Sequence, residues 1–72
     1  MSVDVASLKE TFGDRVRDRR KELNWNQADL AKIAGMLQST VSDIESGKHA
    51  PTLETVEKLA KHLKTTPAAL LE

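Results

Sequence analysis

The first third of the chain carries apolar residues at helical spacing. Four of them fall on one stripe, with charged residues between them: Leu8, Phe12, Val16 and Leu23. Ser7 and Glu10 have the spacing of a capping box at a helix start. Asn24 tolerates the left-handed backbone with which many helices end. The pattern predicts a helix over residues 8–23.

A second helix is predicted over residues 27–34. Its apolar residues are Leu30, Ala31, Ile33 and Ala34. Asn26 is a favourable N-cap, and the carboxylate of Asp29, three residues later, suits the positive end of a helix. Gly35 follows at once and readily adopts the positive φ that helix ends often require.

A third helix is predicted over residues 38–46, where Val41 and Ile44 are spaced three apart and a glycine ends the pattern. Two short helices joined through Gly35 can cross at a large angle, which is the geometry of a helix-turn-helix. Ala31 lies where the two helices would approach most closely, and its small side chain permits that approach. Many small helical proteins contain a helix-glycine-helix unit, so this signal alone is weak.

The remaining residues predict two more helices. Pro51 favours an extended conformation at its predecessor, and Thr52 can cap a helix over residues 53–64. Thr66, followed by a proline at the first helical position, begins a short helix over residues 67–71. The apolar positions of these two helices are Leu53, Val56, Leu59, Ala60, Leu63, Leu70 and Leu71. With no strand pattern or repeat, the expected fold class is all-α with five helices.

Length and composition limit the classes of protein. A chain of 72 residues has room for one small domain, residues 1–72, whose limited core makes a partner subunit a reasonable expectation. It contains no cysteine, which excludes disulfides and thiolate metal sites. Without a signal-peptide pattern or an apolar run of about 20 residues, we expect a soluble, cytoplasmic protein that does not enter a membrane.

Patterns typical of catalysis and metal binding are missing from the sequence. His49 and His62 stand thirteen residues apart and do not share a close helix face. No nucleophile motif or phosphate-binding loop is present. We therefore expect no enzymatic activity, metal ion or cofactor.

The charge balance gives mixed signals for nucleic acid. Eleven Lys and Arg against eleven Asp and Glu give a formal net charge of zero, whereas nucleic-acid-binding proteins usually have a basic excess. Five basic residues nevertheless cluster around a single acid, Asp18: Arg15, Arg17, Arg19, Arg20 and Lys21. This stretch is either a solvated helix face or a patch that faces phosphates.

Residues 26–51 carry a specific set of spacings. NQADLAKIAGMLQSTVSDIESGKHAP resembles the phage repressor and Cro family of helix-turn-helix proteins, known as the XRE type. The matching positions are Gln27, Leu30, Ala31, Gly35, Val41, Ile44, Glu45, Gly47, Lys48 and Pro51. The resemblance implies a compact five-helix, lambda-repressor-like DNA-binding domain with its helix-turn-helix at the second and third helices. The implied function is sequence-specific regulation of transcription by a dimeric repressor that reads a palindromic operator in double-stranded DNA.

The resemblance assigns base contacts to one side of the third helix, at Gln38, Ser39, Thr40 and Asp43. Glutamine can bond adenine N6 and N7, and serine and threonine adapt to several bases. Asp43 is repelled by phosphates unless it accepts from cytosine N4 or faces a neighbouring cation. For each of these residues the alternative is an exposed polar side chain without a role.

Phosphate contacts must come largely from beside the third helix, because residues 27–46 contain one basic residue, Lys32, against three acids. In the family, Gln27 contacts a phosphate at the start of the second helix, where free amides and the helix dipole attract anions, and it supports the first residue of the third helix. The alternative for this glutamine is an exposed side chain without a role. The phosphate candidates are Asn26, Gln27, Ser42, Lys48, His49, Arg17 and Lys21.

Two structural roles also follow from the resemblance. Arg20 and Glu45 match the family's buried ion pair, which fixes the third helix against the first. Leu63, Leu70 and Leu71 lie in the region through which free-standing members commonly dimerise. The alternative for these leucines is that they close the core of the monomer.

The sequence departs from the family pattern at two places. Leu37 replaces the small hydroxyl residue that usually caps the third helix, and leucine cannot accept hydrogen bonds from the free amides. With Met36 it is expected to pack inward, the alternative being an apolar contact for another protein. Trp25 replaces a smaller aliphatic residue and is expected to pack on the core rather than to stack on bases.

The competing function is a protein-interaction module, such as an antitoxin-type element, that uses the same fold. The zero net charge, the acidic Asp43 and the apolar pair Met36 and Leu37 favour it. The ability to enrich a DNA sequence from a random pool separates the two functions.

Overall fold

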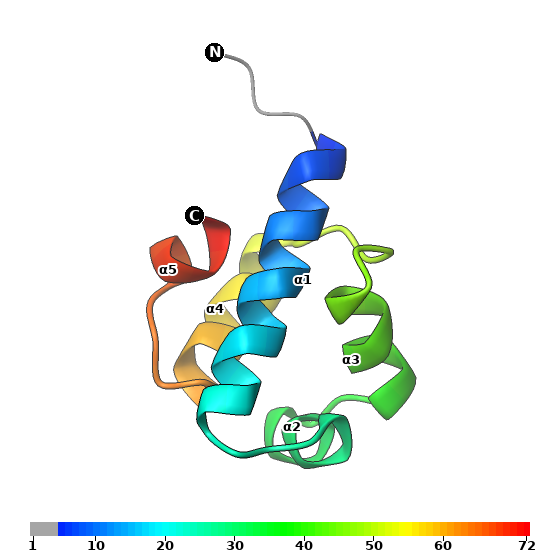
Figure 1. Cartoon of the computed structure of the whole chain (residues 1–72), viewed down its shortest axis with the longest axis vertical. Helices are drawn as coiled ribbons and strands as arrows, with labels where there is room; N and C mark the ends of the chain where they lie inside the picture. The colour runs from blue at the N-terminus through cyan, green and yellow to red at the C-terminus, as the bar shows by residue number, and fades with distance from the viewer. Residues whose placement is uncertain (1–4) are drawn as a thin grey trace.

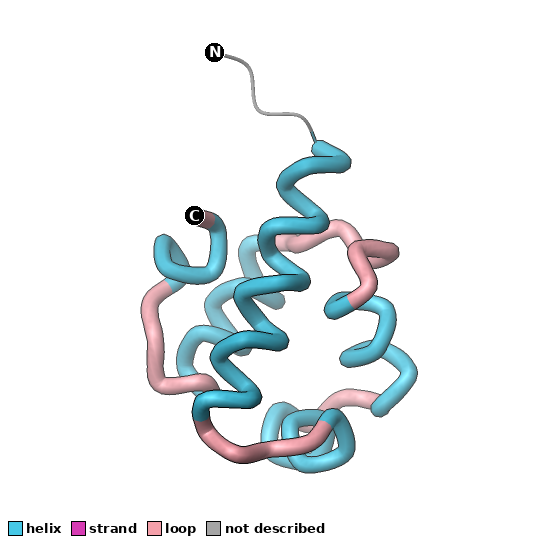
Figure 2. Tube along the Cα trace, viewed as in Figure 1, coloured by secondary structure: helices cyan, strands magenta, loops and turns pink. Residues whose placement is uncertain are grey.

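Five α-helices make up the part of the chain that the structure, a computed structural model, describes: residues 5–72 (Figure 1), with side chains from Ser7 onward. The helices are α1 (Val5–Glu22), α2 (Gln27–Ala34), α3 (Gln38–Glu45), α4 (Leu53–His62) and α5 (Pro67–Leu71). Residues 5–72 contain no strand (Figure 2), which confirms the predicted all-α class. None of these helices is long and apolar enough to cross a membrane.

The long helix α1 runs through the middle of the molecule (Figure 1). Helix α3 packs against one side of α1, and α5 lies on the other side, where it contacts both α1 and α4. Helix α2 lies near the C-terminal end of α1 and contacts α3 and α4. Helices α2 and α3 therefore sit together at one corner, supported from behind by α1 and α4.

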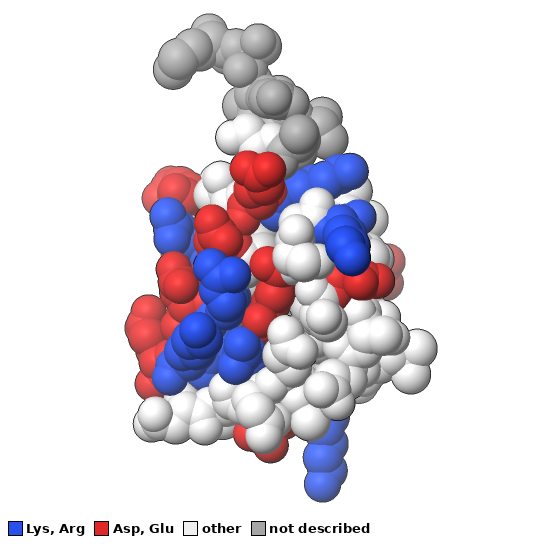
Figure 3. All heavy atoms as spheres, turned by 45° about the vertical axis from the view of Figure 1, so that its right-hand side comes forward, with Lys and Arg blue, Asp and Glu red and all other residues white. Residues whose placement is uncertain are grey.

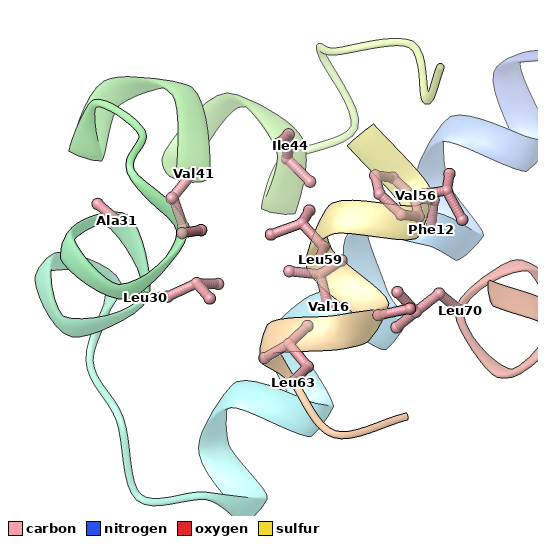
Figure 4. Close-up of a cluster of buried hydrophobic side chains, with 12 residues drawn as sticks. Phe12, Val16, Leu30, Ala31, Val41, Ile44, Val56, Leu59, Leu63 and Leu70 are labelled. Atoms are coloured by element: carbon pink, nitrogen blue, oxygen red, sulfur yellow. The ribbon is translucent and has the colours of Figure 1, made fainter. Parts of the chain in front are cut away.

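Every helix contributes to one apolar core (Figure 4). The buried apolar residues are Phe12, Val16, Leu30, Ala31, Ala34, Val41, Ile44, Val56, Leu59, Ala60, Leu63 and Leu70. Burying one large aliphatic side chain contributes about 1.5–3 kcal/mol to stability. The residues that orient α2 and α3 are thus part of the same packed unit as α1 and α4.

The predicted start of α1 is wrong. The helix begins at Val5, so Ser7 lies inside it and cannot form the predicted capping box with Glu10. Once a helix is nucleated, each further residue adds a backbone hydrogen bond without a side-chain cap, so a serine need not mark its start. The predicted end is nearly right, since α1 stops at Glu22 and Asn24 has the expected left-handed conformation with φ 61°.

Helices α3 and α4 are shorter than predicted, whereas α2 and α5 have the predicted bounds. Helix α3 ends one residue early, and α4 ends at His62 instead of residue 64. Lys64 has φ 56°, and the amide of Thr65 donates to the carbonyl oxygen of Ala60 at 2.9 Å. The chain therefore leaves α4 through a left-handed residue directly after Leu63, the last apolar position of the predicted helix.

Helices α1 and α3 approach each other closely at Gly13. A Cβ atom at this position would lie 2.3 Å from the carbonyl oxygen of Ile44. At this distance the two atoms would overlap, so any other residue would force the helices to move. Nothing in the helical pattern marks Gly13, because a single glycine inside a helix has no partner that the sequence reveals. It is a structural requirement for the position of α3 that only the packed structure shows.

The basic stretch of α1 is neither a uniform solvated face nor a uniform phosphate patch. Arg19 donates from Nε to the carbonyl oxygen of Leu63 at 2.8 Å and from Nη2 to that of Lys64 at 3.2 Å. These carbonyls follow α4, where the helix offers them no amide partner. Arg15 pairs with Asp18, at 3.1 Å. The stretch therefore divides between capping α4, local ion pairs and, at Arg20, a buried pair with α3.

The dimer-interface prediction is wrong for Leu63 and Leu70. Their side chains are 0% and 1% exposed within the monomer, so neither is free to contact a second copy. They close the core beneath α5, which was the alternative for these leucines. Leu71 differs, because it is only partly buried against the core.

Candidate nucleic-acid interface

The turn between α2 and α3 is fixed by hydrogen bonds at both ends of α2. At its start, Asn26 Oδ1 accepts from the amide of Asp29 at 2.7 Å, and the Asp29 carboxylate accepts from the amide of Asn26 at 2.9 Å. At its end, Gly35 has φ 66°, and the Met36 amide donates to the carbonyl oxygen of Ala31 at 2.8 Å. The predicted N-cap and the predicted left-handed glycine are both confirmed. Together they set the direction in which α3 leaves α2.

Helix α3 has one buried and one exposed side. Val41, Ile44 and Glu45 are buried. Four polar residues lie on the outer side and are exposed: Gln38, Ser39, Ser42 and Asp43. Thr40 is half-buried. The structure thus brings the predicted base-reading residues together on one helix of two turns, with Thr40 the least accessible of them.

An ion pair locks α3 to α1. Arg20 donates to Glu45 in a side-on, bidentate manner, from Nε to Oε2 at 2.7 Å and from Nη2 to Oε1 at 2.9 Å. Its remaining nitrogen, Nη1, donates to the carbonyl oxygen of Trp25 at 2.7 Å. Both side chains are almost completely buried. The hydrogen bond to Glu45, together with the attraction of that carboxylate, raises the pKa of Arg20, while burial acts in the opposite direction.

Gln27 belongs to the same network. Its Nε2 atom donates to Glu45 Oε1 at 3.3 Å, which joins the first residue of α2 to the last residue of α3. The family resemblance implies a phosphate contact for this glutamine and support of the first residue of α3, whereas the observed partner is the last residue of α3, Glu45. The two roles are compatible, because the side-chain amide nitrogen has a second hydrogen to donate.

A surface hollow lies where the three helices meet. It is lined by Arg17 of α1, by Gln27 of α2, and by Ser42, Glu45 and the adjoining Ser46 at the end of α3. Three of the predicted phosphate candidates are therefore neighbours in space, although they are separated in the sequence by up to 25 residues. Arg17 is held by Asp14, whose carboxylate accepts from Nη2 at 3.0 Å.

The other phosphate candidates lie outside this hollow. Asn26 uses its side-chain oxygen to cap α2, which leaves only its amide hydrogens to donate. Lys21 and Lys48 are exposed. His49 is half-buried, with Nδ1 3.2 Å from the carbonyl oxygen of Ala50.

The surface over α2 and α3 is broad and largely uncharged, with both basic and acidic groups along its edges (Figure 3). Within residues 5–72, no ion pair involves Asp43. The expectation that a neighbouring cation offsets its charge is therefore not met in the structure. An exposed carboxylate stays on the otherwise neutral side of α3.

The two departures from the family pattern differ in their outcome. Trp25 is partly buried against the core, as expected. Met36 also packs against the core, but Leu37 is 73% exposed, so the expectation of inward packing is wrong for Leu37. As expected, the side chain of Leu37 makes no capping hydrogen bond at the start of α3.

Comparisons with known proteins agree with this geometry. Residues 16–70 match the family model described as helix-turn-helix. The transcriptional repressor RstR of a cryptic CTXφ phage in Vibrio cholerae is 44% identical over 50 residues, which cover 69% of this chain and 45% of RstR. The chain spans about half the length of several curated relatives that it matches.

Two solved structures resemble the molecule over most of its length. The restriction-modification controller protein C.AhdI of Aeromonas hydrophila has a TM-score of 0.80 and 32% identity, and the match covers 86% of this chain and 94% of C.AhdI. Hydroxypropylphosphonic acid epoxidase of S. wedmorenis has a TM-score of 0.84 and 29% identity, covering 90% of this chain but 35% of the enzyme. From the family match over residues 16–70, the chain belongs to the XRE-type helix-turn-helix family.

Proposed function

We propose that the protein binds double-stranded DNA in a sequence-specific manner and represses transcription, with α3 in the major groove. The observation that carries this proposal is the exposed polar side of α3, held in one orientation by the bidentate Arg20–Glu45 pair. A recognition helix must be fixed relative to the protein surface that contacts phosphates, because base contacts depend on register. The cytoplasm is the proposed place of action.

Base reading is assigned to neutral side chains. Gln38 and Ser39 are exposed in the first turn of α3, the part of a recognition helix that approaches base edges. Gln38 suits adenine, whose N7 accepts and whose N6 donates. Thr40 contributes less because it is half-buried. Asp43 accepts from cytosine N4, the partner that best suits a carboxylate in the groove.

Phosphate binding is assigned to the hollow and the exposed cations beside it. Arg17, Gln27 and Ser42 line the hollow and donate to one phosphate together. Further contacts along the DNA backbone come from Lys48, Lys21, His49 and the side-chain amide of Asn26. Because only some of these groups are charged, binding depends less steeply on salt than in strongly basic DNA-binding proteins.

The operator is best sought by selection from random DNA duplexes, followed by footprinting. Wild-type protein should enrich one sequence. Gln38→Ala should bind that sequence more weakly and lose its preference at one base pair, with a cost of about 1–3 kcal/mol for a lost bidentate contact. Glu57→Ala, an exposed residue of α4, is the matched control and should keep the full preference.

A protein-interaction module is the second candidate, and the exposed Leu37 favours it. This second function becomes the better explanation if selection enriches no DNA sequence above the random background. We propose binding rather than catalysis in either case. In the epoxidase the similar region is only 35% of the chain, so the likeness does not extend to most of that enzyme.

A further inference from the structure

We infer that Leu37 is a specificity-determining residue that reads the 5-methyl group of a thymine next to the base pair contacted by Gln38. This inference rests on the proposed DNA-binding function. Neither the family match nor the polar residues of α3 assign Leu37 a contact with DNA. The residue instead departs from the pattern, because leucine cannot cap a helix.

The position of Leu37 excludes a role in the core. Its side chain is 73% exposed, whereas the preceding Met36 packs against the core. It also takes no part in capping, since the amides of Thr40 and Val41 donate to its backbone oxygen, at 3.0 Å and 3.2 Å, and its side chain accepts nothing. The side chain therefore stands free at the start of α3.

Leu37 is continuous with the exposed side of α3. It directly precedes the first turn, in which Gln38 and Ser39 are both exposed. When these two side chains reach base edges, the side chain of Leu37 lies in the same groove, next to the base pair that Gln38 contacts. The apolar group that the major groove presents is the 5-methyl of thymine, and aliphatic side chains are suitable partners for it.

An aliphatic side chain offers nothing to a phosphate or to another polar partner. Along the chain, residues 33–42 that surround Leu37 carry no charge. An exposed leucine loses contact with water when it packs on a methyl group, and this gain requires no hydrogen bond. The partner of the Leu37 side chain is thus the 5-methyl group of a thymine.

The test uses the selected operator, in which each thymine is replaced in turn by deoxyuridine. This change removes one methyl group and leaves base pairing intact. Wild-type protein should lose about threefold to fivefold in affinity at one position, the scale expected for burying one methyl group. Leu37→Ser should bind the thymine and uracil duplexes equally at that position.

Leu53→Ser is the matched control. Leu53 is a second exposed leucine, 81% exposed at the first residue of α4, and this variant should discriminate thymine from uracil as the wild type does. Leu37→Ser should remain folded, because serine is a preferred helix N-cap.

Two results overturn the inference while leaving the proposed function in place. In the first, no uracil substitution weakens DNA binding by the wild-type protein. In the second, the same substitution weakens DNA binding by the wild type and by Leu37→Ser equally. In both cases the exposed leucine belongs to another occupant, such as a protein. If no operator is enriched at all, the proposed function fails and this inference fails with it.

Discussion

At the scale of single residues, the orientation of α3 depends on one buried carboxylate. Glu45 accepts two hydrogen bonds from Arg20 and one from Gln27, so it joins α1, α2 and α3. A buried ion pair stabilises a protein little compared with apolar residues, but removing one member leaves the other charge without a partner. The pair is better understood as fixing geometry than as adding stability.

Glu45→Ala should therefore be strongly destabilising. The expected loss is about 3–5 kcal/mol of unfolding free energy, because the guanidinium of Arg20 stays buried without its carboxylate. Chemical denaturation of both proteins measures it. Asp18→Ala, which removes the half-exposed partner of Arg15, should cost less than about 1 kcal/mol. A loss below about 1 kcal/mol for Glu45→Ala would contradict the structural role.

At the scale of elements, the sequence predicted the helices better than their packing. Asn26, Gly35 and Thr52 mark helix ends through local chemistry, and the structure confirms each. The start of α1 was missed, because a helix can extend past a suitable cap without penalty. Ion pairing of Arg20 with Glu45 followed only from the family resemblance, since residues 25 apart share no local pattern.

Other features of the site depend on the three-dimensional structure alone. The role of Gly13 requires knowing that Ile44 lies across from it. The capping of α4 by Arg19 requires knowing that α1 passes the end of α4. The exposure of Leu37 depends on which way the chain turns after Gly35. None of these can be derived from hydrophobic spacing, because each is a relation between separate elements.

Gly13→Ala tests the crossing of α1 and α3. In an isolated helix this change is favourable by about 1 kcal/mol, because alanine has the higher helix propensity. Here the added Cβ would meet the carbonyl oxygen of Ile44 at 2.3 Å, so α1 must move away from α3. We expect a net destabilisation of about 1–3 kcal/mol, measured by thermal unfolding.

The matched change is Ser7→Ala, also inside α1 but exposed, which should be neutral or slightly stabilising. A Gly13→Ala protein as stable as the wild type would show that the two helices separate at no cost. The close approach would then not be required for the position of α3.

At the scale of the whole molecule, the proposed DNA binding has to work without a net positive charge. Eleven basic and eleven acidic residues cancel, so attraction to DNA depends on where the cations stand. Several arginines of α1 are occupied by Asp14, Asp18, Glu22 and Glu45. The attraction of phosphates therefore depends mainly on exposed lysines near α3, among them Lys48.

Lys48→Ala should therefore weaken binding of all DNA sequences alike. Each phosphate contact releases a counterion, so the slope of log affinity against log salt concentration should become shallower by about 1 for each protomer bound. Titrations at several salt concentrations measure this slope. Lys61→Ala, an exposed lysine in the last turn of α4, is the control and should leave it unchanged. Equal slopes for wild type and Lys48→Ala would exclude this lysine from the interface.

The proposed reading of a palindromic operator requires two copies of the chain. A symmetric dimer places two recognition helices about 34 Å apart, one turn of DNA, and requires a palindromic site. Because Leu63 and Leu70 are buried in the monomer, Leu71 is the remaining candidate among the three leucines. It stands at the end of α5, next to the exposed Ala68 and Ala69.

Leu71→Asp should shift the protein toward monomer in sedimentation experiments, because a carboxylate is costly in an apolar interface. Leu53→Asp, at an exposed leucine of α4, should sediment as the wild type does. The selected operator gives an independent check: about five base pairs inserted between its half-sites, roughly half a helical turn, should abolish cooperative binding by the wild type. Monomeric wild-type protein with and without operator DNA would contradict the dimer, and α3 would then read a single half-site.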